Sequence, residues 1–302
     1  MTHSNSLPAR QDDSAAVANL ISLLDVEMLE TDLYRGRASG AGWVRVFGGQ
    51  VVAQALMAAS KTVPADRLAH SLHSYFLRAG DPKVPIVYRV ERDRDGQSFT
   101  SRRVVAIQHG RPIFNMAASF QVEEPGLNHA AAIPVVALPE TLPTEYESFL
   151  RIAERMGEKY RTSWLSRERP FEFRSAEGHD WSRPHKSPPV SHNWFRPAAP
   201  IVADAVLARC LLAYASDMTL LDTALLPHGL AWNDPALQVA SLDHSLYFHG
   251  TPPLDDWLLY AQDSPIAVGG RGLNRGMIFA RDGQLVASAI QEGLIRYRPE
   301  AA

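Results

Sequence analysis

Apolar residues recur along this chain with the spacing of helices and then of strands, in an order that occurs twice. The first amphipathic pattern predicts a helix from Ser14 to about Met28. Residues 47–63 are apolar on nearly every face, which predicts a helix that is buried all round. Four strand-like runs come next, separated by turn residues such as Asp95 and Gly96, at 69–77, 85–91, 98–108 and 113–122. The first part of the chain is therefore predicted as one buried helix followed by an antiparallel meander.

The same order of elements returns after Pro200. Residues 203–216 again predict a helix that is apolar on most faces, and strand-like runs follow at 237–249, 256–263, 268–280 and 285–297. Matching residues lie 171 to 173 positions apart, namely His73 and His244, Tyr88 and Tyr260, and the turn glycines Gly110 and Gly283. The agreement of these intervals indicates an internal duplication.

Residues 123–200 separate the two patterns and differ in composition, since ten of the 21 prolines lie there. We expect a helix near 144–159 and short strands at 171–174 and 192–196. Much of the remainder should pack on the surface, because a structureless connector of this length is unusual in a compact protein. The chain is thus divided into an N-terminal repeat at 14–123, a connector at 124–168 and a C-terminal repeat at 169–298.

Composition limits the classes of function. The 302 residues carry 30 Lys and Arg against 33 Asp and Glu, a net charge of -3, so a nucleic-acid partner is not expected. The single cysteine, Cys210, can form neither an internal disulfide nor a cysteine zinc site. We see no signal-peptide core, no apolar run near the roughly 20 residues of a membrane span and no peroxisomal S-K-L address. These features favour a cytoplasmic protein.

Most enzymatic signatures are missing from the sequence. It has no G-x-S-x-G elbow, no Walker A motif and no H-E-x-x-H zinc motif. His70 and His73 are three residues apart on a predicted strand, so we expect one core and one surface histidine rather than a metal site. Asp243 and His244 also face opposite sides of a strand, which is the wrong geometry for an acid–base pair.

Three polar residues of the second repeat are harder to explain as scaffold. Asp217 ends a helix, where its carboxylate meets the negative end of the helix dipole. Ser241 opens a strand, and Gln291 interrupts the last strand. Solvent exposure would explain Asp217 or Gln291 taken singly, but together the three groups can hold one water molecule and orient its lone pair. His244, three residues after Ser241, is expected to face away from it.

Seven segments resemble the type II acyl-CoA thioesterases, and the resemblance extends from about residue 16 to 297. In sequence order they are DLYRG (32–36), VFGGQVVAQAL (46–56), HSYFLRAGD (73–81), DGQSF (95–99), YASD (214–217), LDHSLYFH (242–249) and QEG (291–293). The resemblance implies an α+β double hotdog fold, in which each of two fused repeats wraps an antiparallel sheet around a long helix. It also implies that Asp217, Ser241 and Gln291 activate the hydrolytic water, with Ser241 in place of the commoner threonine.

The same resemblance implies hydrolysis of fatty acyl-CoA to free fatty acid and CoA, as part of fatty acid metabolism and without a metal or other cofactor. The first repeat carries Lys61 where the second carries Asp217, so we expect one catalytic and one structural half. Gly48 and Gly49 begin the first buried helix and offer N–H groups to an oxyanion, although tight helix entry explains these glycines equally well.

Two other functions are compatible with the expected fold. A double-hotdog hydratase or dehydratase would need an acid–base pair, for which only Asp243 and His244 are available. A non-catalytic acyl-CoA-binding protein would need none of the three water-holding residues. Hotdog sheets commonly associate, so we expect a homodimer or homotetramer.

Overall fold

The computed structural model describes residues 13–40, 44–153, 155, 157–165 and 167–299. Within these residues the first repeat contains α1 (Asp13–Leu24), β1 (Glu27–Glu30), β2 (Leu33–Gly36), α2 (Gly48–Ser60), β3 (Arg67–Phe76), β4 (Ile86–Asp95), β5 (Phe99–Gln108) and β6 (Arg111–Val122). The connector contains η1 (Pro139–Thr141), α3 (Glu145–Ala153) and α4 (Gly157–Leu165). The second repeat contains β7 (Phe171–Ser175), β8 (Val190–Pro197), α5 (Ala205–Ser216), the 3-10 helix η2 (Leu220–His228), β9 (Leu237–Ser241), β10 (Asp243–Phe248), β11 (Leu258–Val268), β12 (Arg271–Ala280) and β13 (Leu285–Tyr297).

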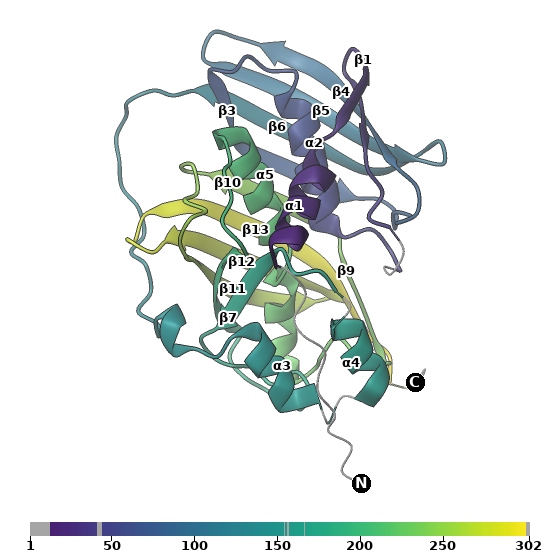
Figure 1. Ribbon diagram of the computed structural model, residues 1–302, viewed down its shortest axis with the longest axis vertical. Coiled ribbons are helices and arrows are strands. Elements are labelled where there is room, and N and C mark those ends of the chain that lie inside the picture. Colours follow the sequence, from purple (N-terminus) through teal and green to yellow (C-terminus); the bar gives the residue numbers. More distant parts are fainter. Residues whose placement is uncertain (1–12, 41–43, 154, 156, 166, 300–302) are drawn as a thin grey trace.

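All strands found in the described residues belong to one sheet, which runs through both repeats. Its order is β1-β2-β4-β5-β6-β3-β10-β13-β12-β11-β8-β7, and β9 pairs with β13 beside this path. Strands β3 and β10 pair antiparallel at the centre, with Leu72 opposite Leu246, so the two repeats share a continuous hydrogen-bonded surface. Figure 1 shows the sheet curving around the central helices.

The helices α2 and α5 pack against each other and fill the inside of the sheet (Figure 1). Every residue of α2 from Gly49 to Ala59 is buried, as the all-apolar pattern predicts. Gln50 and Gln54 are the polar exceptions, and both side chains have partners. In Gln54, Nε2 donates to the Leu23 carbonyl at 2.6 Å, and Oε1 accepts from the Tyr88 hydroxyl at 2.7 Å. Two helices wrapped by one duplicated sheet form the α+β double hotdog fold.

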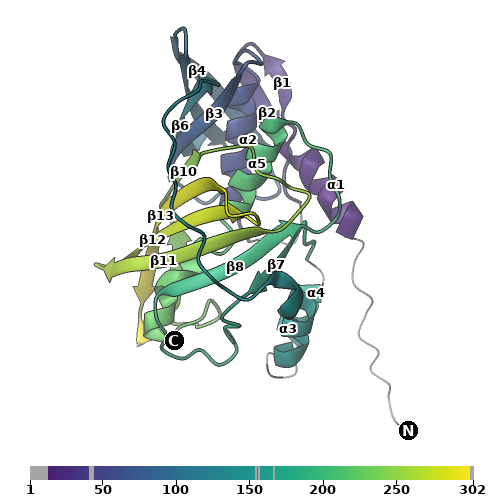
Figure 2. The same cartoon turned by 90° about the vertical axis from the view of Figure 1, so that its left-hand side faces the viewer.

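The connector packs on the outer face of the second repeat. Leu259 joins a separate apolar cluster with Trp194, against which Ile133 and Val136 of the connector pack. The indole N–H of Trp194 also donates to the Ala137 carbonyl at 2.9 Å. Figure 2 shows this segment crossing the strands of the second repeat on its way to α3. The stretch is irregular but attached, and the limits of 124 and 168 for a connector remain our prediction.

The pattern of burial shows which residues of the two repeats are equivalent. His73 is exposed and His244 is buried, so the predicted match between these two histidines is wrong. A different alignment of the repeats places buried residues opposite buried residues. It matches Leu72 with His244, Arg102 with Asn274, and Ala118 with Gln291. Ladder pairing agrees, because Arg102 lies opposite Ala118 just as Asn274 lies opposite Gln291.

Three other sequence predictions need correction, and one element was missed. The first helix ends at Leu24, because Glu27–Glu30 forms a hairpin with β2 rather than another helical turn. The helix expected over 144–159 is two helices, α3 and α4. The strand expected over 237–249 is divided at Leu242, whose N–H bonds to β13 and whose carbonyl bonds to β3. The 3-10 helix η2 was not predicted at all.

Among the residues that the structure describes, no helix combines the length and the hydropathy needed to cross a membrane.

Candidate active site

A cavity of about 710 Å³ opens between the two repeats. Its apolar walls come from both halves and include Val51, Phe76, Phe114, Phe171, Tyr214, Met218 and Leu221. Four arginines also line it, namely Arg45, Arg78, Arg167 and Arg169. Among its polar lining residues are Asp217 and Ser241, two of the three predicted site residues.

Asp217 is the C-cap residue of α5, at the point where α2 begins. Two glycines at the start of α2 allow this close approach, because neither has a Cβ. A Cβ on Gly48 would lie 2.7 Å from Asp217 Oδ2, and a Cβ on Gly49 would lie 2.5 Å from the Tyr214 carbonyl oxygen. The backbone N–H of Gly49 donates to the Asp217 carboxylate. The N-terminal end of α2 therefore faces a carboxylate at the C-terminal end of α5.

The surroundings of Asp217 favour its protonated form. Burial is the main cause and raises the pKa of this carboxyl from 3.8 to about 6. Three groups act in the other direction: hydrogen bonds from Gln291 and from the Gly49 N–H, and the positive charge of Arg45. A carboxylate with a pKa near neutrality is well suited to accept and return a proton at physiological pH.

Gln291 contacts Asp217 directly. This residue of β13 is completely buried, and its Nε2 donates to Asp217 Oδ1 at 2.5 Å. The amide must present its NH₂ group to the carboxylate, because the opposite orientation would place two acceptor oxygens together. Its Oε1 is buried and has no hydrogen-bond partner among the described residues.

His244 is the residue of this cluster that the sequence prediction missed. Its side chain is completely buried, with Nδ1 lying 3.2 Å from Gln291 Nε2 and Nε2 lying 2.9 Å from Ser216 Oγ. The sequence did contain an indication that His244 is buried. It lies two and four residues before the apolar residues Leu246 and Phe248, so side-chain alternation along the strand places all three on the same face. Asp243 faces the other side and accepts a hydrogen bond from the Glu292 N–H at 2.6 Å.

Ser241 lies at the end of β9 and lines the cavity. Its register contradicts the expectation that His244 faces away from it. Ser241 is opposite Gly293, whereas Ser245 is opposite Ile290, so the pairing with β13 shifts by one residue at Leu242. The shift places Ser241 and His244 on the same face of the sheet.

The known proteins most relevant to this geometry are thioesterases. Residues 36–121 match the family model for the acyl-CoA thioesterase N-terminal domain, and residues 158–294 match that for acyl-CoA thioesterase. The chain is 42% identical to acyl-CoA thioesterase 2 of Haemophilus influenzae, covering 92% of this chain and 97% of that one. It is 40% identical to human acyl-coenzyme A thioesterase 8, covering 93% and 90% of the two chains. The chain belongs to the acyl-CoA thioesterase family.

A solved structure supports the same assignment for the fold. The acyl-CoA thioesterase II of Mycobacterium marinum superposes with a TM-score of 0.76 at 41% identity, covering 93% of this chain and 98% of that one. A hotdog-fold protein from Alicyclobacillus acidocaldarius superposes with a TM-score of 0.71 at 18% identity. Membership of this family makes the chain an enzyme, and its cavity is the candidate active site.

A second carboxylate of this thioesterase cavity was also missed. Asp222, in η2, lines the cavity and accepts a hydrogen bond from the Trp232 indole N–H. Burial raises the pKa of its carboxyl to about 7. No pattern in the sequence points to it, because the 3-10 helix that carries Asp222 was not predicted.

The remaining histidine prediction is partly wrong. His73 is exposed and bonds to Ser245 Oγ at 3.2 Å, but His70 is half-buried rather than a core residue and bonds to Ser119 Oγ at 2.8 Å. A bulge between Ala69 and Ser71 explains the difference, because it disturbs the alternation of faces. Within the described part of the chain, no group of three or more His, Cys, Asp or Glu side chains is arranged to hold a metal ion.

Proposed function

We propose that this enzyme hydrolyses fatty acyl-CoA to free fatty acid and CoA, with Asp217 as the general base. The observation that carries the proposal is the contact of a half-buried carboxylate of raised pKa with Gln291 at the wall of a largely apolar cavity. The apolar walls suit an acyl chain, and the arginines suit the phosphates of CoA.

In the proposed reaction, Asp217 takes a proton from water while the water oxygen attacks the thioester carbonyl carbon. The tetrahedral intermediate then collapses, the C–S bond breaks, and the thiolate of CoA leaves with the proton that Asp217 took from the water, which regenerates the base. Ser241 and Gln291 position the water by hydrogen bonds. The unpartnered Oε1 of Gln291 supports this role, because both N–H groups of that amide already have partners.

The oxyanion role of the α2 N-terminus is narrower than the sequence suggested. Because the Gly49 N–H donates to Asp217, this group holds the base in place and is not available to the substrate oxygen. We propose that the neighbouring Gly48 N–H, at the first position of the same helix, is available to the developing oxyanion.

The two competing functions have less support. A hydratase would need Asp243 and His244 to act together, but Asp243 bonds to the Glu292 N–H while His244 bonds to Gln291 and Ser216. A non-catalytic binder would have no use for a buried carboxylate held by an amide.

Release of free CoA from acyl-CoAs of graded chain length, followed with a thiol reagent, tests the proposal. We expect release by the wild type and a fall in kcat on the order of 10²–10⁴ for Asp217→Asn, the range for loss of a general base. Asp243→Asn is the matched control, since an amide oxygen can still accept from the Glu292 N–H. Normal turnover by a correctly folded Asp217→Asn variant would contradict the mechanism, and absence of CoA release from the wild type would favour the binder.

A further inference from the structure

A chain of hydrogen bonds leads away from the base into the core. Gln291 Nε2 lies 2.5 Å from Asp217 Oδ1 and 3.2 Å from His244 Nδ1. His244 Nε2 lies 2.9 Å from Ser216 Oγ, which in turn donates to the Ala213 carbonyl at 3.0 Å. Gln291, His244 and Ser216 are each completely buried, so water does not compete for these bonds.

The direction of each bond in this chain is determined. Gln291 Nε2 can only donate, so Nδ1 of His244 must be the acceptor, and the ring proton lies on Nε2. That proton is donated to Ser216 Oγ, whose own proton is committed to Ala213. The ring must be neutral to accept at Nδ1, and burial lowers the pKa of His244 to about 4, well below neutral pH.

The first repeat has the same fold without the Asp217 and Gln291 pair, so it shows which residues the fold itself requires. There Leu72 occupies the position of His244 and Ala118 the position of Gln291, and the two lie opposite each other on β3 and β6. Lys61 occupies the C-cap position of α2 that Asp217 occupies in α5. The histidine therefore occurs in the repeat that has the amide and the carboxylate, and an aliphatic residue fills its place in the other, so the scaffold itself does not require it.

We infer that His244 is a positioning residue for hydrolysis: its Nδ1 lone pair fixes the Gln291 amide in the orientation that donates to Asp217. With the other N–H held by His244, the amide cannot turn its oxygen toward the carboxylate, and its Oε1 keeps a single direction. This inference rests on the proposed roles of Asp217 and Gln291. His244 itself does not line the cavity, so its effect is transmitted through Gln291.

Two polar substitutions separate the two ends of the imidazole. In His244→Asn the side-chain oxygen takes the place of Nδ1 and can still accept from Gln291. In His244→Gln the amide reaches only the place of Nε2 and keeps the contact with Ser216. We expect kcat to stay within about 3-fold of wild type for Asn and to fall by about 10- to 100-fold for Gln, the cost of a small misplacement in the site. KM should stay unchanged in both, because the cavity lining is intact.

Ser74→Ala is the matched control. The Ser74 hydroxyl donates to the backbone carbonyl of His244 at 2.8 Å from the other strand, so its loss weakens the same segment without touching the Nδ1 contact. We expect kcat to be unchanged. An equal loss of kcat in the Asn and Gln variants, or full activity in His244→Gln, would overturn the inference.

Combining His244→Gln with Gln291→Ala distinguishes this inference from the proposed function. If His244 acts through Gln291, the histidine substitution should lower kcat in the wild-type background and have no further effect in Gln291→Ala. Additive losses would overturn the positioning role. Normal kcat for Gln291→Ala alone would instead refute the proposed role of Gln291 in positioning the water and leave the hydrolysis itself standing.

A measurement on the unmodified protein covers variants that fail to fold. In protein labelled with ¹⁵N-histidine, NMR should show His244 as the neutral tautomer protonated at Nε2 at pH 7. A proton on Nδ1 would be incompatible with the bond from Gln291 and would overturn the inference.

Discussion

The pH dependence of turnover follows from the burial of the Asp217 carboxylate. Because its pKa is raised to about 6, the base is protonated below that pH, and kcat should fall as the pH drops through it. Arg45 holds this pKa down by its charge, so Arg45→Met should move the acidic limb of the kcat profile to higher pH. Asp222 also lines the cavity with a raised pKa, but Arg45 is not among the groups that shift it. A profile that does not move in Arg45→Met would assign the limb to another group.

Ser241 is expected to hold water rather than to attack the substrate. A serine nucleophile needs a neighbouring base, and His244, although on the same face, already uses both ring nitrogens on Gln291 and Ser216. We therefore expect no burst of CoA release and no acyl adduct by mass spectrometry after rapid quench. Ser241→Thr should retain most activity, whereas Ser241→Ala should lose about 10- to 10³-fold in kcat. An acyl group on Ser241 would contradict this mechanism while leaving the hydrolase activity in place.

Single residues were predictable where their chemistry conflicts with their surroundings. Asp217 at the end of an apolar helix and Gln291 within an apolar strand stand out in the sequence, and the structure brings them into contact. His244 was missed because strict alternation from Ser241 places it on the opposite face. The one-residue shift at Leu242 depends on pairing with two neighbouring strands, which no local pattern reveals.

At the level of elements, the close approach of α2 and α5 depends on glycine. A Cβ on Gly49 would lie 2.5 Å from a backbone oxygen of α5, which cannot move aside as a side chain can. Gly49→Ala should therefore destabilise the protein by about 1–3 kcal/mol, the usual cost of overpacking, and separate Asp217 from its N–H donor. Chemical denaturation measures the first effect and kcat the second. Gly126→Ala is the control, because a Cβ there meets nothing within 4 Å; equal stability of the two variants would show that the helices can part without cost.

The long elements were predictable because their patterns extend over many residues, as in α2, α5 and β13. Short elements were not: β1 and β2 have four residues each, too few for a period to be recognised. The 3-10 helix η2 has neither the helical nor the strand period, and so the carboxylate of Asp222 remained hidden.

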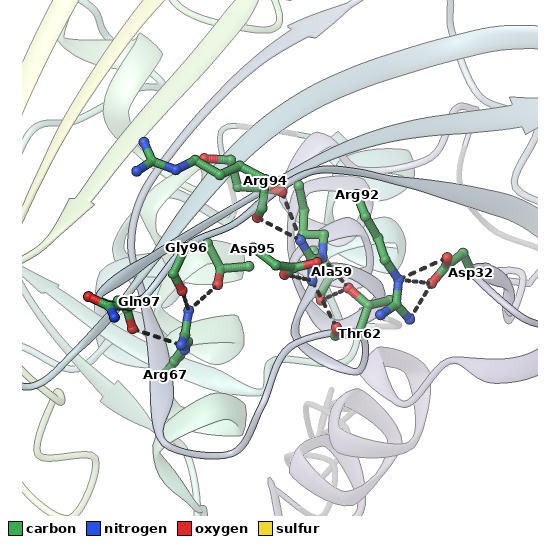
Figure 3. Close-up of polar contacts among 12 residues, drawn as sticks. Asp32, Ala59, Thr62, Arg67, Arg92, Arg94, Asp95, Gly96 and Gln97 are labelled. Atoms are coloured by element: carbon green, nitrogen blue, oxygen red, sulfur yellow. Dashed lines mark hydrogen bonds and ion pairs between the residues drawn. The ribbon is translucent and has the colours of Figure 1, made fainter.

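At the level of the whole molecule, the two repeats have the same fold, but their buried polar residues differ. Where the second repeat has Asn274, the first has Arg102, which is almost completely buried. Its guanidinium donates to Thr62 Oγ1 at 2.8 Å and to Asp95 Oδ1 at 2.6 Å. Figure 3 shows Thr62 and Asp95 within the polar contacts around the end of α2. The first repeat thus contains a buried arginine with its own partners beside the end of α2, and it has neither an acid nor an amide at the positions of Asp217 and Gln291.

This asymmetry predicts that Lys61 has no part in catalysis. Its ammonium group lies at the surface and bonds to Asp25 Oδ1 at 2.7 Å and to the Val26 carbonyl at 2.8 Å. Neither Leu72 nor Ala118, which stand in for His244 and Gln291, could hold a water beside it. Lys61→Met should leave kcat within about 2-fold of wild type and lower the free energy of unfolding by at most about 1 kcal/mol, the value of an exposed ion pair. Steady-state kinetics and denaturant unfolding measure the two quantities. A large loss of kcat in a stable Lys61→Met protein would mean that both repeats contribute a site. Lys61 is related to Asp217 by its equivalent position in the duplication, so such a loss would have to come from a site in the first repeat.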